Sequence, residues 1–445
     1  MYKTICLLVI FFANINVFTQ SITNNPLSYY GIGEQSFGTN AIYNALGQNT
    51  ISYYDSSQLN IFNPASYASL SSGNTLVSLG IDFRRSQFSE LKNTNSQVAV
   101  MPDHFAMGFK LSKIIGLAFG IKPYSSRGYE ITEYDSLNSL TNKYQGTGGI
   151  RTFFLGTSIR VINKQKSKLA FGVNAESIFG SVTNSRISKM FSTSSDYPSG
   201  ISNSTIKLSA INVDFGVSFN RNFSKIHNLM LSAVYTPNLL LQRLSLKDEI
   251  FYAKLLSGTI AYDTISFSVS SASMMSSSSK AGFSYTLSLP NWRRNMRQLH
   301  PSIMLVGSYS NSSMTLLDSK KIMSHLGFGI QFIPETKLFE NSTNLKFLEK
   351  VQYRIGYFQQ QNSISSVIDK SINISGLTFG FGLPILVQQS LSSLNIGFTF
   401  GKNTDSISTS LAEKYFAMNF GIILSPPFFD RWFRKRKLDK IDMLK

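Results

Sequence analysis

The sequence contains a single cysteine in 445 residues, Cys6. It lies in a short apolar stretch at the start of the chain, which we expect to be removed on export. A lipoprotein attachment cysteine would follow such a stretch, whereas Cys6 opens it. The mature chain is therefore expected to carry no thiol, which excludes disulfides, thiolate metal sites and a cysteine nucleophile.

Charged residues are also scarce, at 15% of the chain compared with roughly 25% in ordinary soluble proteins. Long apolar runs are missing too: after the N-terminus there is no stretch of about 18 apolar residues, so transmembrane helices are not expected. The net charge of +18 suggests a nucleic-acid partner. An export signal argues against that partner, and the one dense basic run, 431–440, is by default a solvated tail.

Residues 1–20 have the pattern of a secretory signal peptide. Lys3 precedes an apolar run from Ile5 to Phe12, and a more polar stretch ends near Gln20. The run is too short for a spanning helix, and no stop-transfer pattern follows it. We predict that this segment is cleaved on export; the alternative is an N-terminal strand of the core.

Alternation of apolar with small or polar residues dominates the chain from residue 76 onwards. In the clearest segment, 211–220, Ile, Val and Phe alternate with Asn, Asp, Gly and Ser. Side chains of a strand point to opposite faces with period two, so each segment has one apolar face. About 14 strands are predicted, centred on 77–84, 105–112, 115–122, 155–161, 169–176, 211–220, 229–235, 283–289, 303–309, 326–332, 351–357, 377–383, 394–401 and 416–424.

The connections between these segments alternate between long and short over the first half of the chain. Outer-membrane barrels have short periplasmic turns, long external loops and an even number of strands. The connection 334–349 is long where a short turn is expected, and a short periplasmic helix would account for it. We expect long loops at 128–149, 184–205 and 243–279, and short turns at 112–113, 163–167 and 222–228.

This pattern predicts an all-β protein whose residues 73–425 form a transmembrane antiparallel β-barrel in the outer membrane of a Gram-negative cell. A stack of β-sandwiches would show the same alternation, but it would have to pair its apolar faces inside. Here the opposite face carries Gly, Ser, Asn, Thr and scattered charges, which suit a watery lumen. Closure into a barrel also removes the unpaired strand edges that hydrocarbon does not tolerate. The first expected partner is outer-membrane lipid.

Eight charged residues fall on the face that is predicted to line the lumen. On the lipid face an Arg or Lys at mid-depth costs about 2–4 kcal/mol, so charges at this depth belong inside. Such charges can pin an internal plug or hydrate the lumen, or they can line a permeation path; we favour plug pinning. The residues are Asp82, Arg84, Lys110, Lys122, Arg160, Glu176, Asp214 and Arg354.

Motifs for catalysis or metal binding are missing. The four histidines, His104, His227, His300 and His325, fall in predicted turns or at strand ends without ligand spacing, so we interpret each as an isolated loop histidine. There is no G-x-S-x-G, H-E-x-x-H or P-loop sequence. We therefore predict no catalytic residue, no metal site and no cofactor; an outer-membrane enzyme is unsupported.

Residues 21–72 do not show strand periodicity, and their aromatic content is high for a disordered leader. We interpret them as a compact segment packed against or inside the barrel. Its two motifs resemble those of the FadL-like outer-membrane barrels, in the version widespread in Bacteroidetes. Tyr29-Tyr30-Gly31-Ile32-Gly33-Glu34 is similar to the S-x-Y-G-x-G-D/E opening of that group. Asn63-Pro64-Ala65-Ser66-Tyr67 matches the N-P-A-S motif that closes the N-terminal hatch of these barrels.

The C-terminal end carries further resemblance. The stretch 379–384 followed by 393–397 is similar to the penultimate hairpin of the same group. Trp432-Phe433-Arg434-Lys435-Arg436-Lys437 resembles its W-F-x-K-R-K-x-D tail, so residues 426–445 are predicted to form a basic periplasmic tail. Two features depart from the pattern: Pro426-Pro427 precedes the tail, and Lys402-Asn403 stands where Gly-Thr is usual. The middle of the chain is covered by barrel periodicity alone.

The resemblance implies a 14-stranded barrel plugged by its N-terminal residues. It implies a passive uptake channel for hydrophobic small molecules, which bind in the lumen and leave through a kink in a strand. That function predicts a break in a strand and an apolar pocket between hatch and wall. The alternative is a plug or accessory subunit of the type IX secretion translocon, with a larger translocon barrel as its partner. We expect deletion of residues 428–445 to weaken that association.

Overall fold

In the computed structural model the described residues are 25–29, 31–36, 40–71, 75–90, 93–135, 140–190, 200–238, 242–256, 259–289, 292–294, 297–316, 319–338, 345–366, 368–387, 390–405 and 411–425. The predicted signal peptide, Tyr30 of the opening motif and the predicted basic tail with Trp432–Lys437 lie outside them.

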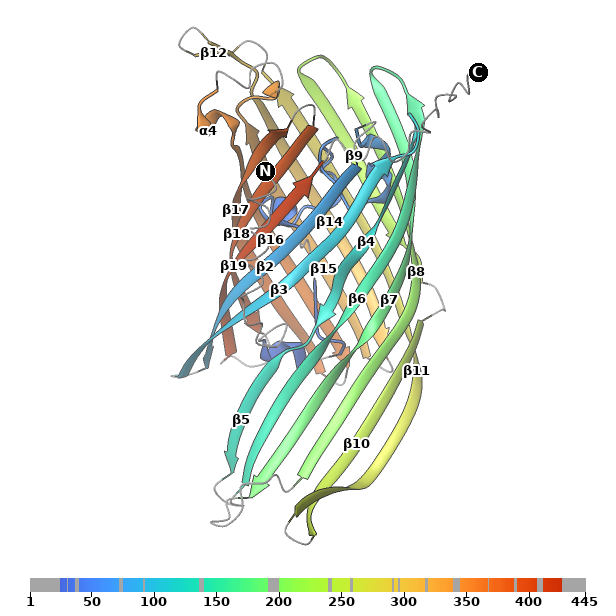
Figure 1. The fold of residues 1–445 in the computed structure, drawn as a ribbon, viewed down its shortest axis with the longest axis vertical. Helices are drawn as coiled ribbons and strands as arrows, with labels where there is room; N and C mark the ends of the chain where they lie inside the picture. The colour runs from blue at the N-terminus through green and yellow to red at the C-terminus, as the bar shows by residue number, and fades with distance from the viewer. Residues whose placement is uncertain are drawn as a thin grey trace, which may run out of the picture.

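The wall is a closed antiparallel barrel of 14 strands, as predicted (Figure 1). It closes where the last strand pairs with the first, with Leu424 opposite Val77. Two of the strands are interrupted and carry two labels each. In chain order the strands are β2 (Thr75–Glu90), β3 (Asn93–Lys110), β4 with β5 (Ile115–Ser126, Tyr129–Asp135), β6 (Leu140–Asn163), β7 (Ser167–Met190), β8 (Gly200–Asn222), β9 with β10 (His227–Thr236, Gln242–Leu256), β11 (Thr259–Ser288), β14 (Ser302–Leu316), β15 (Ser319–Ile333), β16 (Gln352–Ser366), β17 (Ile368–Val387), β18 (Ser390–Asp405) and β19 (Leu411–Leu424).

The two faces of the wall follow the alternation in the sequence. In β8, Phe215 points outward and is 49% exposed, whereas its neighbour Asp214 points inward and is 8% exposed. Large apolar side chains are exposed in the same way all round the barrel, for example Phe153, Leu305 and Ile422. An outer surface of this kind suits lipid, and it leaves the polar residues to the interior.

The ends of the barrel differ (Figure 1). At the short-turn end, brief turns join β3 to β4, β6 to β7 and β8 to β9. At the opposite, long-loop end, β5–β8, β10 and β11 project beyond the rest of the wall (Figure 1). The prediction of loops at 128–149, 184–205 and 243–279 was wrong for most of the residues that the structure describes there, because these continue the strands as antiparallel pairs. Backbone pairing with neighbouring strands stabilises these extensions. Apolar and polar residues do not alternate clearly there, because neither lipid nor a core covers one face.

The short-turn end carries two small additions. A hairpin of β12 (Trp292–Arg294) and β13 (Arg297–Leu299) lies between β11 and β14. The helix α4 (Phe347–Lys350) precedes β16, in the connection where a short helix was expected. Among the described residues, no helix has the length and apolar character needed to cross a membrane.

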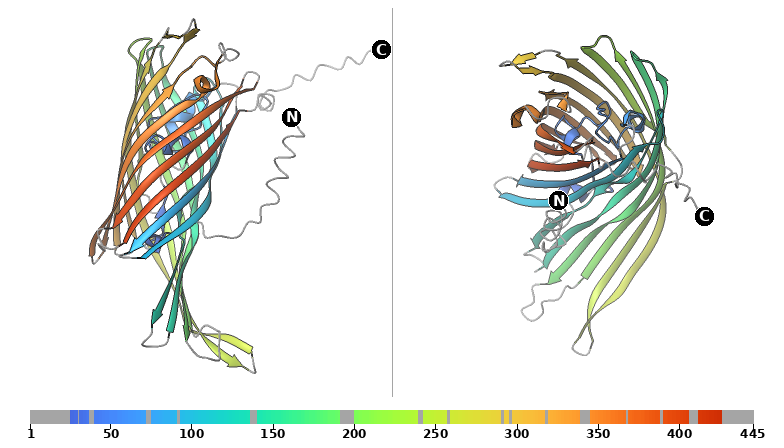
Figure 2. Two further views of the ribbon diagram at one scale, coloured as in Figure 1. Left: turned by 90° about the vertical axis from the view of Figure 1, so that its left-hand side faces the viewer. Right: turned by 45° about the horizontal axis from the view of Figure 1, so that its top comes forward.

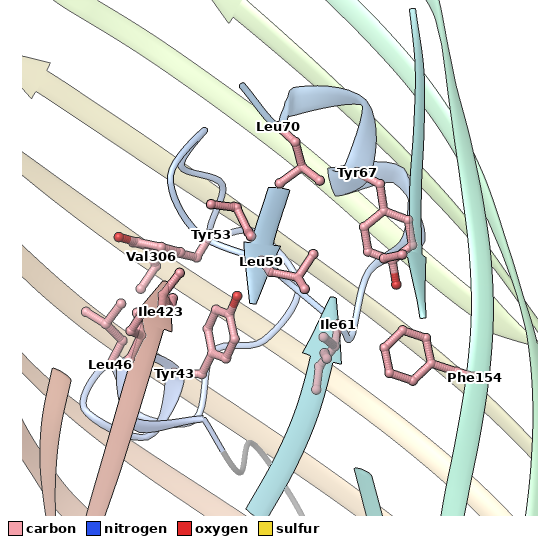
Figure 3. Packing of buried hydrophobic residues seen from close by; sticks show 14 residues of the cluster. Tyr43, Leu46, Tyr53, Leu59, Ile61, Tyr67, Leu70, Phe154, Val306 and Ile423 are labelled. Carbon is pink, nitrogen blue, oxygen red and sulfur yellow. The ribbon is translucent and has the colours of Figure 1, made fainter. Parts of the chain in front are cut away.

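The described residues between 25 and 71, here called the N-terminal segment, lie inside the barrel (Figures 1 and 2). The segment contains η1 (Pro26–Tyr29), β1 (Glu34–Gln35), α2 (Ala41–Asn44) and η2 (Pro64–Ser69). Its apolar side chains pack on inward residues of the wall, and Figure 3 shows this cluster around Tyr43, Leu59, Tyr67, Phe154 and Val306. The apolar core of the protein is therefore enclosed by the barrel and built largely by this segment.

Inward-facing glycines bring the wall close to the N-terminal segment. A methyl group at Gly172 would overlap the backbone of Pro64, and one at Gly356 would overlap the backbone of Gly47. From the sequence, the small residues of this face were expected to line a watery lumen. The structure gives these glycines a different role, because only a residue without a side chain leaves room for the backbone of the segment there.

Candidate functional site: the N-terminal segment and the interrupted wall

The Asn63-Pro64-Ala65 motif forms the start of η2. Asn63 caps this helix: its Oδ1 accepts a hydrogen bond from the Ala65 backbone N–H at 3.0 Å, and its Nδ2 donates to the Ile51 carbonyl at 2.9 Å. Pro64 occupies the first helical position, where a missing N–H has no cost. The motif residues are fully or almost fully buried, so their contacts stabilise the fold of the N-terminal segment itself.

The glycines of the opening motif set the path of the chain towards β1. Gly31 and Gly33 have φ values of +61° and +97°, a conformation that residues with side chains rarely adopt. Gly33 also lies against the Ser126 backbone, with no space for a side chain. Immediately after it, β1 pairs with the end of β4, Gln35 opposite Ser125.

The wall is incompletely paired beside this contact. β3 pairs with β4 only from Phe105 to Lys110. Beyond Phe105, β3 pairs with β2 alone and β5 pairs with β6 alone, within the described residues. Pro102 of β3 and Pro123 of β4 stand just past the last pair, and a proline cannot donate to a ladder. A lateral gap in the hydrogen bonding of the wall therefore separates β3 from β5 (Figure 1).

Arg127 lies at the break between β4 and β5 and holds the N-terminal segment there. Its side chain is fully buried. The Nε atom donates to the Ser28 carbonyl at 3.1 Å, and Nη2 donates to the carbonyls of Tyr29, at 3.1 Å, and Gly31. The next residue, Gly128, accepts a 2.7 Å hydrogen bond from the Asn25 backbone N–H. Arg127 was not among the residues predicted from the sequence; its signal is an Arg-Gly pair that interrupts the alternation four residues after Pro123.

Arg84 connects the N-terminal segment to two strands. Its Nη1 lies 2.8 Å from Glu34 Oε1 in β1, and its Nη2 lies 2.8 Å from Glu413 Oε1 in β19. Burial opposes ionisation of Glu34, but the charge of Arg84 and its hydrogen bond outweigh burial and hold the pKa of Glu34 below its usual 4.5. Asn25 Nδ2 adds a 3.1 Å hydrogen bond to the same carboxylate.

Three of the predicted inward charges gather on β4, β7 and β8. Lys122 Nζ lies 2.7 Å from Glu176 Oε1, and Asp214 Oδ1 accepts a 2.6 Å hydrogen bond from Thr236. The Lys122 ammonium also lies 5.4 Å from the ring centre of Phe62 in the N-terminal segment. Lys280 of β11, which the sequence analysis did not select, lines the same cavity as these charges.

The remaining predicted charges have separate surroundings. Arg354 donates to Gln352 at 2.6 Å and to Asn395 at 3.1 Å, and Asp82 accepts from Asn419 at 2.5 Å; these contacts join wall to wall. Arg160 donates to the Ala68 carbonyl of the N-terminal segment at 2.5 Å. Lys110 is half-exposed at the end of β3, without a hydrogen bond or ion pair to the described residues.

None of the four histidines is the isolated loop residue that was expected: His227 Nδ1 lies 2.5 Å from Tyr285 Oη, and His300 Nδ1 lies 3.4 Å from Glu335 Oε1. His325 is buried, bonds Gln48 at 3.1 Å and stacks on Phe358. His104 is buried at a bulge between β2 and β3, with its Nε2 2.7 Å from Ser78 Oγ and its Nδ1 2.8 Å from Asp103 Oδ2. Hydrogen bonds link Ser78, His104 and Asp103 in the Ser–His–Asp order of a hydrolase triad. Ser78, however, is fully buried and lines neither of the two cavities between the N-terminal segment and the wall. We interpret these three residues as polar contacts that stabilise the bulge.

Two cavities lie between the N-terminal segment and the wall, of about 170 and 160 Å³. Both are mixed: the first is lined by Glu34, Arg84 and amides together with apolar residues such as Phe358 and Ile372, and the second by Lys122, Glu176 and serines together with Ile51 and Met314. The expected pocket between hatch and wall is therefore only partly apolar. An apolar surface does exist, where Ile150, Ile178, Val182, Leu208 and Leu244 face inward, but Ile32 of the N-terminal segment packs against it. Ile32 is only 1% exposed.

The comparisons with known proteins identify the family. A family model described as BamG matches residues 1–439. The chain belongs to the BamG family. No curated protein matches the chain.

Solved structures give the fold of this BamG-family protein. The Pseudomonas putida toluene transporter TodX is 14% identical, with a TM-score of 0.50 over 89% of this chain and 99% of that one. A TodX deltaS2S3 mutant, described as a monoaromatic hydrocarbon channel, is 15% identical, with a TM-score of 0.52 over 87% and 99% of the two chains. At these identities the likeness shows the fold alone. The fold that this chain shares with them is the antiparallel β-barrel.

Proposed function

We propose that this protein is an outer-membrane channel that takes up hydrophobic small molecules and releases them sideways through the gap between β3 and β5. The observation that carries the proposal is that gap, beside which Arg127 holds the N-terminal segment by the carbonyls of Ser28, Tyr29 and Gly31. Two proteins of similar fold, a toluene transporter and a monoaromatic hydrocarbon channel, support the substrate class.

In this proposal the N-terminal segment is a hatch that must move. Ile32 occupies the apolar surface formed by residues such as Ile150 and Leu208, and an apolar ligand would bind there by displacing it. Burying apolar area of the ligand contributes about 25 cal/mol per Å², which offsets the loss of the Ile32 contacts. Arg84 and Arg160, which bond the segment directly, would then act as pins.

The experiment locks the segment to the wall. Gln35 and Ser125 are direct partners across β1 and β4, so Gln35→Cys with Ser125→Cys places two thiols within disulfide reach. We expect the oxidised variant to lose most of its uptake of a radiolabelled monoaromatic hydrocarbon in cells, and a reducing agent to restore it. A matched control disulfide joins Asn142→Cys and Ser188→Cys in the β6–β7 hairpin and should leave uptake unchanged. Equal uptake by the locked and reduced forms would refute the proposal.

A second candidate is an accessory role in an outer-membrane assembly, for which the BamG match is a hint. The structural observation in its favour is α4 at the short-turn end, where Phe347 and Leu348 are 65% and 66% exposed. Neighbouring apolar side chains exposed to this degree suit a protein partner. The comparisons lend no support to the translocon role.

A mild-detergent pull-down from native outer membrane tests the second candidate. Stoichiometric recovery of a larger barrel that is lost in Phe347→Ser/Leu348→Ser would support it. If the unaltered protein is recovered without a partner, the channel remains the proposed function.

A further inference from the structure

A groove of about 570 Å³ runs along the outer face of the wall over β2, β16, β17, β18 and β19. Its apolar part is formed by Leu377, Phe400 and Phe416, and its cationic part by Arg85, Lys402 and Lys414. It lies on the outside of the barrel, because these side chains alternate with inward residues such as Asn403 and Glu413, which are 3% and 1% exposed. The groove is therefore separate from the proposed channel.

Strand pairing brings the three cations together. Lys402 of β18 lies directly opposite Lys414 of β19. In the pair of β19 with β2, Lys414 lies opposite Gln87. Arg85 is two residues from Gln87 along β2. Directly opposed side chains on one face have Cβ atoms about 4.5–5.5 Å apart, and diagonal neighbours about 7–8 Å. No sequence motif indicates this cluster, because its members are far apart in the chain.

This arrangement lacks a compensating charge within the described residues. Like charges directly opposite each other destabilise a sheet, and cations on a lipid-facing surface are unfavourable. Arg85, Lys402 and Lys414 form no ion pair with any described carboxylate. The carboxylate next to Lys414 in the sequence, Glu413, points inward and bonds Arg84 at 2.8 Å. A negatively charged group from outside the described residues would relieve this repulsion.

The position of the cluster indicates what supplies that charge. Each of the three residues lies three to five residues from the long-loop end of its strand. Towards the short-turn end the same strands expose Ile81, Phe420 and Ile422, an apolar band. The cations thus lie at the edge of that band, where lipid head groups would meet the protein if the band contacts acyl chains.

We propose that this groove binds a phosphorylated lipid of the outer leaflet, with its phosphate between Arg85, Lys402 and Lys414 and its acyl chains along Leu377, Phe400 and Phe416. Arginine can bind a phosphate through two parallel hydrogen bonds, and the lysines add point charges. The proposal rests on the barrel and its place in the outer membrane and is independent of the channel function.

The test compares Arg85→Gln/Lys402→Gln/Lys414→Gln with the unaltered protein, purified in mild detergent. Binding of bisphosphorylated lipid A and of its chemically dephosphorylated form is measured by native mass spectrometry. We expect the triple variant to bind the phosphorylated lipid at least ten-fold more weakly, and the unaltered protein to prefer the phosphorylated form by a similar factor. The control variant, Lys189→Gln/Lys207→Gln/Arg221→Gln, removes three exposed and scattered cations of β7 and β8 and should bind like the unaltered protein.

Two further measurements separate the proposal from its competitors. Millimolar inorganic phosphate should not displace the lipid; displacement would indicate a free-phosphate site and overturn the proposal. In lipid-free detergent the triple variant should unfold at the same temperature as the unaltered protein or at a higher one, because the repulsion between the three cations is gone. Added phosphorylated lipid should raise the unfolding temperature of the unaltered protein but not that of the triple variant. Equal binding by the triple and control variants, or equal binding of both lipid forms, would also overturn it.

Discussion

The Nε atom of Arg127 in the wall donates a 3.1 Å hydrogen bond to the carbonyl oxygen of Ser28 in the N-terminal segment. Arg127 is fully buried at the break between β4 and β5, so its guanidinium depends on this segment for its partners. The pair joins the interrupted strand to the segment that fills the barrel. It therefore couples the integrity of the wall to the position of the segment.

Replacing Arg127 by Met should release the segment. The guanidinium bonds the carbonyls of Ser28, Tyr29 and Gly31, and hydrogen bonds to charged groups contribute about 1.5–3 kcal/mol each. We expect cells with Arg127→Met to become more permeable to hydrophobic antibiotics, measured as a lower inhibitory concentration. Arg186→Met, in which the lost cation faces the ring of Tyr144 in the projecting hairpin, is the control. An unchanged sensitivity of the Arg127 variant would contradict this role.

The contact between Glu34 and Arg84 should make stability depend on pH. The pKa of Glu34 is held below 4.5 in the folded protein, so the contact stabilises fully above pH 4.5 and is lost as the pH falls through the lowered pKa. We expect the unfolding temperature in detergent to fall below about pH 4. Glu34→Gln should remove part of that fall, while Glu133→Gln, at an exposed site of β5, should keep it. Identical pH profiles for all three proteins would show that Glu34 is not responsible.

Gly172→Ala should destabilise the protein because of the close approach of Pro64. A methyl group at Gly172 would overlap that backbone, and overpacking of this kind costs about 1–3 kcal/mol. We expect a lower midpoint of unfolding in denaturant. Gly200→Ala is the matched control, because its methyl group would have its nearest neighbour, the Phe251 carbonyl oxygen, at 3.7 Å. A similar effect of both substitutions would argue against tight packing of the segment on the wall.

Lys122→Met should leave a buried carboxylate without its cation. Lys122 and Glu176 are 2.7 Å apart, and their side chains are 13% and 8% exposed. Removing one member of a buried pair costs about 3–5 kcal/mol, whereas replacing both is far less damaging. We expect Lys122→Met/Glu176→Leu to recover most of the unfolding free energy lost in the single variant. Two independent, additive losses would mean that the ion pair is not coupled.

The inward charges show how far the sequence could predict the candidate site. Period-two alternation placed Asp214 and Glu176 on the inner face, and both are buried there. The sequence could not tell that Arg84 and Arg160 would bond the N-terminal segment whereas Arg354 bonds the wall. Arg84 is 50 residues from Glu34, Arg160 is 92 residues from Ala68, and Arg354 is 41 residues from Asn395. Which residues meet depends on the register of distant strands.

The local pattern of the chain determined the class of the fold. Alternating apolar residues in strands such as 211–220 specify which face meets lipid, and the Asn63-Pro64 turn and the glycines before Glu34 specify local bends, since these properties depend on neighbours within a few residues. Only the tertiary structure decided the rest. The gap beside Arg127, the packing of Ile32 and the cluster of Arg85, Lys402 and Lys414 arise from closing the barrel around the N-terminal segment. Closure sets contacts between residues that no local pattern connects.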